Sequence, residues 1–317
     1  MRRARDHRRN LRQEIHSDLG VTQANGGVPV RFGFKTSPQY TTWRELLAFW
    51  QVADEIPFYE SGWVFDHFYP IPQPGREFAP SGPCLEGWSV LAALASATAR
   101  LRLGMLVTGI HYRNVAVLAK MAVAVDHVSA GRLELGLGAG WNEHESDAYG
   151  IYLGPPSQRS DRLEEACAVL TSLLTEDLTN FSGTYFTLTG AMCEPKSVQQ
   201  PRPPIVIGGS GERRTLRTAA RFADHWNYVG VQPELFPRKR QVLREHCAAL
   251  GRDPSEIVLS SHVWLAGSTA ADLAAMTRTV EYYAGQQLDL AIIYVLPPLD
   301  PAVLELASAA LADFSQA

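Results

Sequence analysis

The chain has 317 residues, of which 46% are hydrophobic and 20% are charged, and its formal net charge is -4 at pH 7. This length allows one large buried core, and the composition is ordinary for a soluble enzyme. The weakly negative charge gives no electrostatic reason to bind nucleic acid, and no apolar run approaches the length of a membrane span. We therefore expect a small-molecule partner and neither a nucleic acid nor a membrane.

The four cysteines lie far apart and include no C-x-x-C pair. This spacing argues against a zinc ribbon, a redox dithiol or a disulfide scaffold. Reduced thiols in a cytoplasmic protein fit best.

Residues 1–29 differ from the rest of the chain, because arginines recur through the first twelve positions and a polar run ends in Asn25-Gly26-Gly27. The segment lacks the apolar stretch of a secretory signal. We predict a flexible basic extension over 1–29, with packing on another subunit or an anionic surface as an alternative, and a single domain over 30–317.

Strand-like and helix-like segments alternate through the remaining sequence. The predicted strands are 31–36, 61–66, 101–108, 132–138, 204–208, 224–229, 256–264 and 290–295, and the predicted helices are 41–55, 85–99, 114–129, 158–175, 211–222, 233–250, 269–284 and 301–314. Eight such alternations predict an α/β fold of the (β/α)8 TIM barrel type, whereas a Rossmann sheet usually stops near six strands.

Two segments interrupt the regular alternation. The fourth unit carries an insertion from Tyr149 to about Gln158, and residues 180–188 alternate around a Ser182-Gly183 turn. The second segment predicts a small hairpin outside the barrel, after the fourth helix. Long inserts of this kind on a barrel are usually lids.

Candidate functional residues follow the predicted strands, where barrels of this type carry their chemistry. The second strand ends in Asp66 and His67, the third in Thr108, and the fourth in Gly138, Ala139, Gly140, Trp141 and Asn142. Glycines at the end of the fourth strand indicate that the backbone must come close to something, which we interpret as a ligand. The fifth strand ends in Gly208, Gly209, Ser210 and Gly211 directly before a helix, a pattern suited to binding phosphate.

Each of these positions also has a simpler structural interpretation. The Gly208–Gly211 segment is also compatible with a tight turn, although its place between a β-branched strand and a helix favours phosphate binding. Asp66 is also compatible with a helix cap or an arginine pair, and His67 with an ordinary loop histidine. Trp141 and Trp226 are compatible with cofactor stacking or with packing. The acidic run from Glu143 to Asp147 indicates a solvated loop, and we expect no metal site.

Five motifs, taken together and in this order, resemble the bacterial luciferase-like monooxygenase family, most closely its F420-dependent oxidoreductase branch. They are W-V-F-D-H-F at 63–68, Y-R-N at 112–114 with L-A-K at 118–120, D-H-V-S-A-G-R at 126–132, G-L-G-A-G-W-N-E-H-E at 136–145, and P-K-S-V-Q-Q-P-R-P-P-I-V-I-G-G at 195–209. The resemblance covers about residues 31–230. One departure is Asn114-Val115, where the family usually has Asn-Pro.

The resemblance implies a (β/α)8 barrel that holds FMN or the deazaflavin F420 over its mouth. It places Asp66 and His67 beside the ring, Thr108 in contact with it and the segment from Gly138 to Asn142 at its border, and it assigns the phosphate to Gly208, Gly209 and Ser210. It also implies a non-proline cis peptide within Val107 to Gly109.

The predicted reaction is hydride transfer between F420 and a small organic substrate, with His67 transferring the proton because imidazole titrates near neutral pH. An FMNH2-dependent monooxygenase that uses O2 and a separate reductase is the first alternative, and a cofactor-binding protein without turnover is the second. The apolar segment 85–99 is compatible with a homodimer interface or with packing on the barrel.

Overall fold

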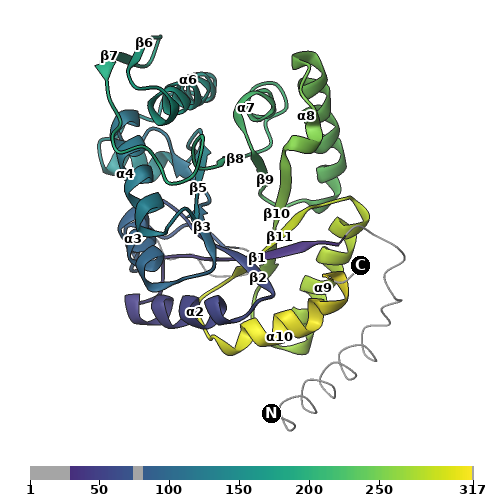
Figure 1. The fold of residues 1–317 in the computed structure, drawn as a ribbon. Coiled ribbons are helices and arrows are strands. Elements are labelled where there is room, and N and C mark those ends of the chain that lie inside the picture. Colours follow the sequence, from purple (N-terminus) through teal and green to yellow (C-terminus); the bar gives the residue numbers. More distant parts are fainter. Residues whose placement is uncertain (1–28, 74–80, 316–317) are drawn as a thin grey trace.

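The computed structural model describes residues 29–73 and 81–315 and contains a closed parallel barrel. The barrel strands are β1 (Arg31–Thr36), β2 (Tyr59–Val64), β3 (Arg102–Met105), β4 (Thr108–Gly109), β5 (Leu133–Gly138), β8 (Ile205–Gly208), β9 (His225–Tyr228), β10 (Val258–Leu265) and β11 (Leu290–Val295). The short strands β3 and β4 follow each other along the same strand position of the barrel, and both pair with β5. The pairing of β3 with β5 closes the ring (Figure 1). The predicted (β/α)8 barrel is confirmed. The predicted basic extension falls almost wholly on residues 1–28, outside the described residues.

Helices surround the barrel at the predicted places. They are α2 (Trp43–Glu55), α3 (Gly87–Ala97), α4 (Val115–Val128), α6 (Pro156–Thr175), α7 (Thr215–Phe222), α8 (Phe236–Leu250), α9 (Ala270–Gly285) and α10 (Ala302–Leu311). Asn114 caps α4 by accepting a hydrogen bond from the Ala116 amide at 2.9 Å, so the helix begins there without the proline. Helix α7 begins four residues later than predicted, which leaves an open turn after β8. No helix among the described residues combines the length and apolar character needed to cross a membrane.

The predicted hairpin is also present. Strands β6 (Thr179–Ser182) and β7 (Thr187–Ala191) pair antiparallel beside α6 and outside the barrel (Figure 1). The carboxylate of Glu165 on α6 accepts hydrogen bonds from the amides of Thr184 and Tyr185, both at 2.8 Å, and so fixes the turn between the two strands.

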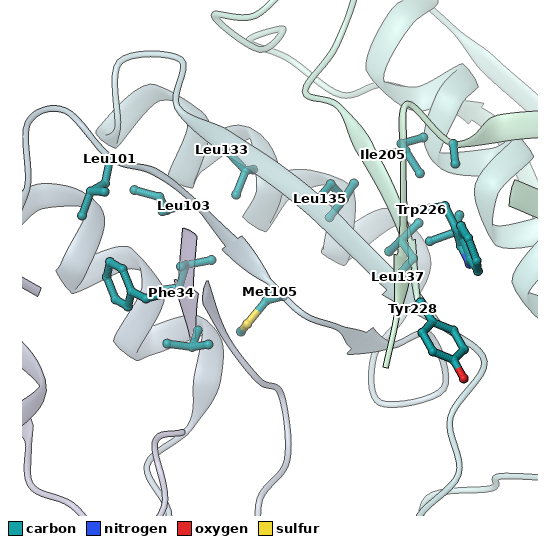
Figure 2. Packing of buried hydrophobic residues seen from close by; sticks show 14 of the residues in the cluster. Phe34, Leu101, Leu103, Met105, Leu133, Leu135, Leu137, Ile205, Trp226 and Tyr228 are labelled. Carbon is teal, nitrogen blue, oxygen red and sulfur yellow. The ribbon is translucent and has the colours of Figure 1, made fainter. Parts of the chain in front are cut away.

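Strand β5 shows how alternation divides the two layers of the core. Leu133, Leu135 and Leu137 point away from the barrel axis and pack with other buried residues of the main apolar cluster (Figure 2). Glu134, Gly136 and Gly138 alternate with them and therefore face the barrel interior, because successive side chains of a strand point to opposite faces. Burial of each leucine contributes about 1.5–3 kcal/mol.

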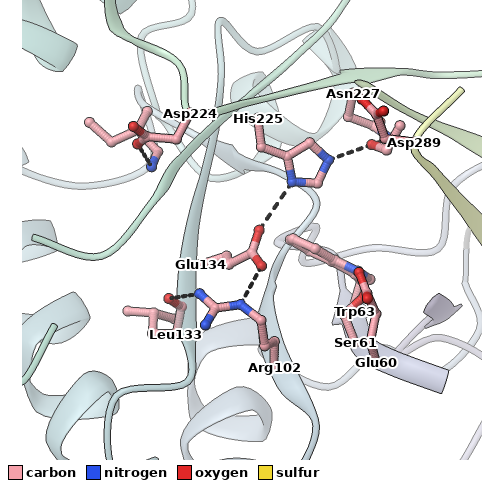
Figure 3. A network of polar contacts seen from close by, with 12 residues as sticks. Glu60, Ser61, Trp63, Arg102, Leu133, Glu134, Asp224, His225, Asn227 and Asp289 are labelled. Atoms are coloured by element: carbon pink, nitrogen blue, oxygen red, sulfur yellow. Dashed lines mark hydrogen bonds and ion pairs between the residues drawn. The ribbon is translucent and has the colours of Figure 1, made fainter. Parts of the chain in front are cut away.

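A polar network fills the amino-terminal end of the barrel interior (Figure 3). Glu134 accepts a hydrogen bond from Arg102 Nε at 2.7 Å and lies 3.0 Å from His225 Nδ1. His225 Nε2 lies 2.6 Å from Ser260 Oγ, which accepts a hydrogen bond from Asn227 Nδ2 at 2.9 Å. The network thus connects four strands, β3, β5, β9 and β10, and ends at Asn227, a residue of the cavity described below.

Replacing Glu134 by glutamine is expected to lower the free energy of unfolding at pH 7 by about 1–3 kcal/mol, because Arg102 and His225 lose a charged hydrogen-bond partner. Burial alone would raise the pKa of Glu134, but His225 and Arg102 outweigh burial and lower the pKa to about 2. A carboxylate whose pKa is lowered in the folded state stabilises the fold at pH values above its pKa in the unfolded chain, 4.5. This contribution is lost as the pH falls from 4.5 towards 2.

Urea unfolding at pH 7 and pH 3 checks this expectation. The variant E134Q should unfold at lower urea concentration than the wild type at pH 7, and the difference should shrink at pH 3. Glu256→Gln is the matched control, because the Glu256 side chain is 60% exposed and pairs with Arg252 away from this network, so its loss should cost about 0–1 kcal/mol. Equal midpoints for wild type and E134Q at pH 7 would contradict the assigned role.

Candidate active site

A cavity of about 660 Å³ opens at the carboxyl ends of the barrel strands. Its size is within the range of small-molecule and cofactor sites. Its lining combines glycines, apolar and aromatic side chains, and a few polar groups. The residues discussed below that line it are Lys35, His67, Leu106, Val107, Tyr112, Gly138, Ala139, Gly140, Trp141, Gly208, Gly209, Thr215, Asn227, His262, Trp264 and Tyr294.

The sequence-predicted site residues converge on this one rim, at the ends of β2, β4, β5 and β8. Six of them line the cavity: His67, Gly138, Ala139, Gly140, Gly208 and Gly209. The other four, Asp66, Thr108, Asn142 and Ser210, are not among the lining residues.

Asp66 and Thr108 are buried behind the cavity wall. Asp66 forms a bidentate ion pair with Arg113, one oxygen lying 2.9 Å from the guanidinium, and Arg113 also contacts Glu86 at 2.9 Å. Burial raises the pKa of Asp66 to about 6, although Arg113 opposes the rise. Thr108 Oγ1 accepts a hydrogen bond from Trp88 Nε1 at 2.9 Å. The sequence left a helix cap or an arginine pair as structural interpretations of Asp66, and the structure contains the arginine pair.

The glycines at the strand ends line the cavity and also make room for protein side chains. A Cβ atom on Gly138 or Gly208 would lie 2.6 Å or 2.8 Å from the side chain of Val107, and one on Gly140 would lie 2.5 Å from His111. What approaches the backbone at these places is therefore Val107 and His111. Val107 follows a non-proline cis peptide between Leu106 and Val107, one bond earlier than the predicted range.

A buried carboxylate orients His67. Glu145 Oε2 lies 2.8 Å from His67 Nδ1 and accepts a hydrogen bond from the Tyr112 hydroxyl, while Glu145 Oε1 accepts hydrogen bonds from the amides of Phe68 and of Tyr69, the latter at 3.1 Å. Burial would raise the pKa of Glu145, but His67, Tyr112 and the Phe68 amide outweigh burial and lower it. An ionised Glu145 requires a proton on Nδ1, so Nε2 is the ring nitrogen left for a ligand.

The acidic run from Glu143 to Asp147 is helix α5 (Glu143–Ala148) and not the predicted solvated loop, since Glu145 and Ser146 are fully buried. Asn142 caps this helix by accepting a hydrogen bond from the Glu145 amide at 3.2 Å. An Asn followed three residues later by Glu is a known signature of a helix start and was the available signal. The cap explains why Asn142 does not line the cavity.

The two tryptophans near the strand ends differ in position. Trp141 is 55% exposed, lines the cavity and contacts the edge of His67 with ring centroids 5.3 Å apart. Trp226 is fully buried outside the barrel wall, where it stacks on Phe236 of α8 at 5.8 Å (Figure 2). Only Trp141 is placed to contact a ligand.

The turn after β8 is open towards the cavity. Gly209 has a φ of +121°, and a Cβ atom there would meet only Thr215, at 3.2 Å. Helix α7 follows without a side-chain cap at its start. Unpaired amides at the start of a helix attract anions, so this turn is chemically suited to a phosphate group.

Fold and site together define a TIM barrel with a ligand cavity at the carboxyl ends of its strands. The model of the luciferase-like monooxygenase family matches residues 26–311, and the chain belongs to this family. Among curated relatives, the chain is 30% identical over 214 residues to an F420-dependent glucose-6-phosphate dehydrogenase of Microbacterium testaceum, covering 67% of this chain and 60% of that protein. It is 34% identical over 176 residues to a phthiodiolone/phenolphthiodiolone dimycocerosates ketoreductase of Mycobacterium tuberculosis, covering 54% of this chain and 45% of that protein.

The matched segments thus span about half of the length of these curated relatives. Among solved structures, an F420-dependent secondary alcohol dehydrogenase in complex with an F420-acetone adduct matches with a TM-score of 0.77 at 17% identity, covering 92% of this chain and all of the other. The monooxygenase RslO1 from Streptomyces bottropensis matches with a TM-score of 0.72 at 18% identity, covering 88% and 98% of the two chains. At these identities the two structures show a shared fold.

Proposed function

We propose that the protein is an F420-dependent oxidoreductase that transfers a hydride between the deazaflavin and a small organic substrate at the barrel mouth. The observation that carries the proposal is a histidine of the cavity wall, His67, whose free ring nitrogen is fixed by the buried Glu145. Relatives named for F420-dependent activity support the choice of cofactor.

The residues around the cavity fit a flat ring with a phosphate tail. Val107, Gly138 and Gly208 present a low apolar surface on one wall, and Gly209 and Thr215 border the open turn suited to phosphate. In this proposal Ala139 and Gly140 border the ring and Ser210 adds to the phosphate site. Asp66, Thr108 and Asn142 act from behind the wall, by holding Arg113, Trp88 and α5.

Bound F420 supplies a carbon atom that gives or accepts a hydride, so the chain itself needs no covalent nucleophile. His67 contributes the proton, given or taken at Nε2, while its Nδ1 stays bound to Glu145. Apolar and aromatic residues of the lining keep water away from the reacting atoms.

Fluorescence titration with F420 and with FMN tests the proposal. We expect F420 to bind at least about tenfold more tightly, a difference of about 1.4 kcal/mol. Preference for FMN would instead favour the FMNH2-dependent monooxygenase that uses O2 and a separate reductase. Tight F420 binding without turnover on any substrate of a broad panel would indicate a cofactor carrier.

Replacing Gly209 by alanine is expected to weaken F420 binding about tenfold, because a φ of +121° costs a side-chain-bearing residue roughly 1–2 kcal/mol and the turn would shift. The same titration measures the effect. Gly285→Ala is the matched control, since a Cβ atom there meets nothing within 4 Å in α9. Unchanged affinity of G209A would remove this turn from the cofactor site.

A cytoplasmic location and a homodimer belong to the same proposal. Light scattering on the purified full chain measures the mass in solution, and a mass of 34.9 kDa would contradict the dimer.

A further inference from the structure

Four aromatic and basic side chains lie on the cavity wall opposite the apolar surface of Val107, Gly138 and Gly208, which we name the Val107 surface. Lys35 of β1 pairs in register with Tyr294 of β11, and Tyr294 pairs with Trp264 of β10. His262 lies two residues before Trp264 and therefore faces the same interior. All four line the cavity, and we name Lys35, His262 and Trp264 the Lys35 wall.

In the strand order of the closed barrel, β10, β11 and β1 lie across from β4, β5 and β8. The Val107 surface with Gly138 and Gly208 belongs to the second group of strands. The cavity therefore extends from the Val107 surface to the Lys35 wall, and the Lys35 side chain reaches across it to the Leu106 carbonyl beside Val107.

The Lys35 wall carries polar atoms without partners. His262 is 4% exposed, and although it faces the Val229 carbonyl, neither ring nitrogen makes a hydrogen bond of normal geometry to residues 29–73 or 81–315. The indole Nε1 of Trp264 is also buried and without a partner within the described part of the chain. Buried polar groups in folded proteins are normally hydrogen-bonded, so unpaired N–H groups at a cavity indicate a missing acceptor.

Lys35 adds a buried positive charge. Its Nζ donates a hydrogen bond to the Leu106 carbonyl at 2.9 Å and lies 4.6 Å from the centre of the Tyr294 ring. Among residues 29–73 and 81–315, no carboxylate lies within 4 Å of Nζ, and the cavity lining contains no aspartate or glutamate. Burial lowers the pKa of Lys35 to about 7, as expected for an ammonium group without a counterion.

We propose that the Lys35 wall is a carboxylate-binding subsite and that the substrate is a small organic acid. A carboxylate is acceptor-only, so it matches the ammonium of Lys35, the N–H of neutral His262 and the indole N–H of Trp264. The inference rests on the proposed function in one respect, because it names the substrate class of that same cavity. The substrate thus lies with its carboxylate at the Lys35 wall.

Binding of benzoate and benzamide to the purified protein without cofactor, measured by calorimetry, tests the subsite. The two molecules share size and shape and differ in charge. We expect benzoate to bind at least about tenfold more tightly to the wild type, since a charge-assisted hydrogen bond contributes about 1.5–3 kcal/mol. In Lys35→Met this preference should disappear, with benzamide affinity nearly unchanged.

Two further variants keep the test decisive. Trp264→Phe removes one N–H, retains the ring and should weaken benzoate binding severalfold, which reports on the subsite even if K35M does not fold. Lys239→Met removes a lysine from the outer helix α8, where it pairs with Glu212 at 2.9 Å, and should leave both affinities unchanged.

Equal affinities of the wild type for benzoate and benzamide would overturn the subsite, as would a benzoate preference that survives in both K35M and W264F. Because these titrations contain no F420, their outcome is independent of the F420 and FMN titrations. Failure of F420 to bind would therefore contradict the proposed function alone, and equal affinities of the wild type for benzoate and benzamide would contradict only the substrate class.

Discussion

Replacing His67 by alanine is expected to lower turnover with F420 by about 10²–10⁴-fold, while F420 affinity stays nearly unchanged. The reason is that the imidazole reaches the cavity with a single free nitrogen, whereas the surfaces suited to the cofactor lie on β5, β8 and the turn at Gly209. Steady-state measurement of F420 absorbance with a panel of small organic acids gives the turnover, and fluorescence titration gives the affinity.

His127→Ala is the matched control, because His127 lies on the outer helix α4, where its Nε2 contacts the Lys196 carbonyl at 2.8 Å. Added imidazole should partly restore turnover in H67A, since the lost group is a proton carrier. Turnover equal to that of the wild type would remove His67 from the reaction, and a large loss of F420 affinity would show that the ring positions the cofactor.

The barrel could be predicted because its signals are local. The leucines of β5 alternate with Glu134, Gly136 and Gly138, and each strand of this kind precedes a segment with helical periodicity. The predicted boundaries differ where local chemistry overrides the pattern. One predicted strand over 101–108 is divided into β3 and β4, with Leu106 and Val107 between them, and α7 begins only after the open turn at Gly209.

The sequence predicts at which strand ends the site lies, but not which side chains form its surface. Strand ends identify Asp66, His67 and Gly208 as neighbours, because the carboxyl ends of parallel strands meet at one face. They do not say which side chain faces the ligand. Glycines at strand ends indicate a close approach, but the pattern does not show that Val107 and His111 occupy the space that a Cβ atom would need.

Contacts between distant segments explain the residues that the sequence did not identify. His67 and Glu145 are 78 positions apart, and nothing local to either residue predicts that they meet. Lys35 stands inside the strand R-F-G-F-K-T, where a lysine has no special meaning until the barrel places it beside His262 and Tyr294. The chemistry of the cavity therefore depends on tertiary packing, whereas its location depends on the repeating pattern.

Replacing Glu145 by glutamine is expected to lower turnover by about 10²-fold without a comparable loss of F420 affinity. Glutamine retains one acceptor oxygen, which can serve the Phe68 and Tyr69 amides, but it turns an NH2 group towards His67 and Tyr112. Two donors then face each other, so His67 must rotate or exchange its ring proton, and a displacement of about 1 Å is enough for a loss of this size. The same assays of turnover and affinity measure the change.

Glu143→Gln is the matched control on the same helix, because the Glu143 side chain is 75% exposed and pairs with Arg159 at the surface. E143Q should retain full turnover. If E145Q also retained it, the carboxylate would not be what orients His67, and the proton would have to reach the cavity through another group. Loss of turnover in E145Q together with retained F420 binding would instead show that a buried carboxylate far away in the sequence determines which nitrogen of His67 is available for proton transfer.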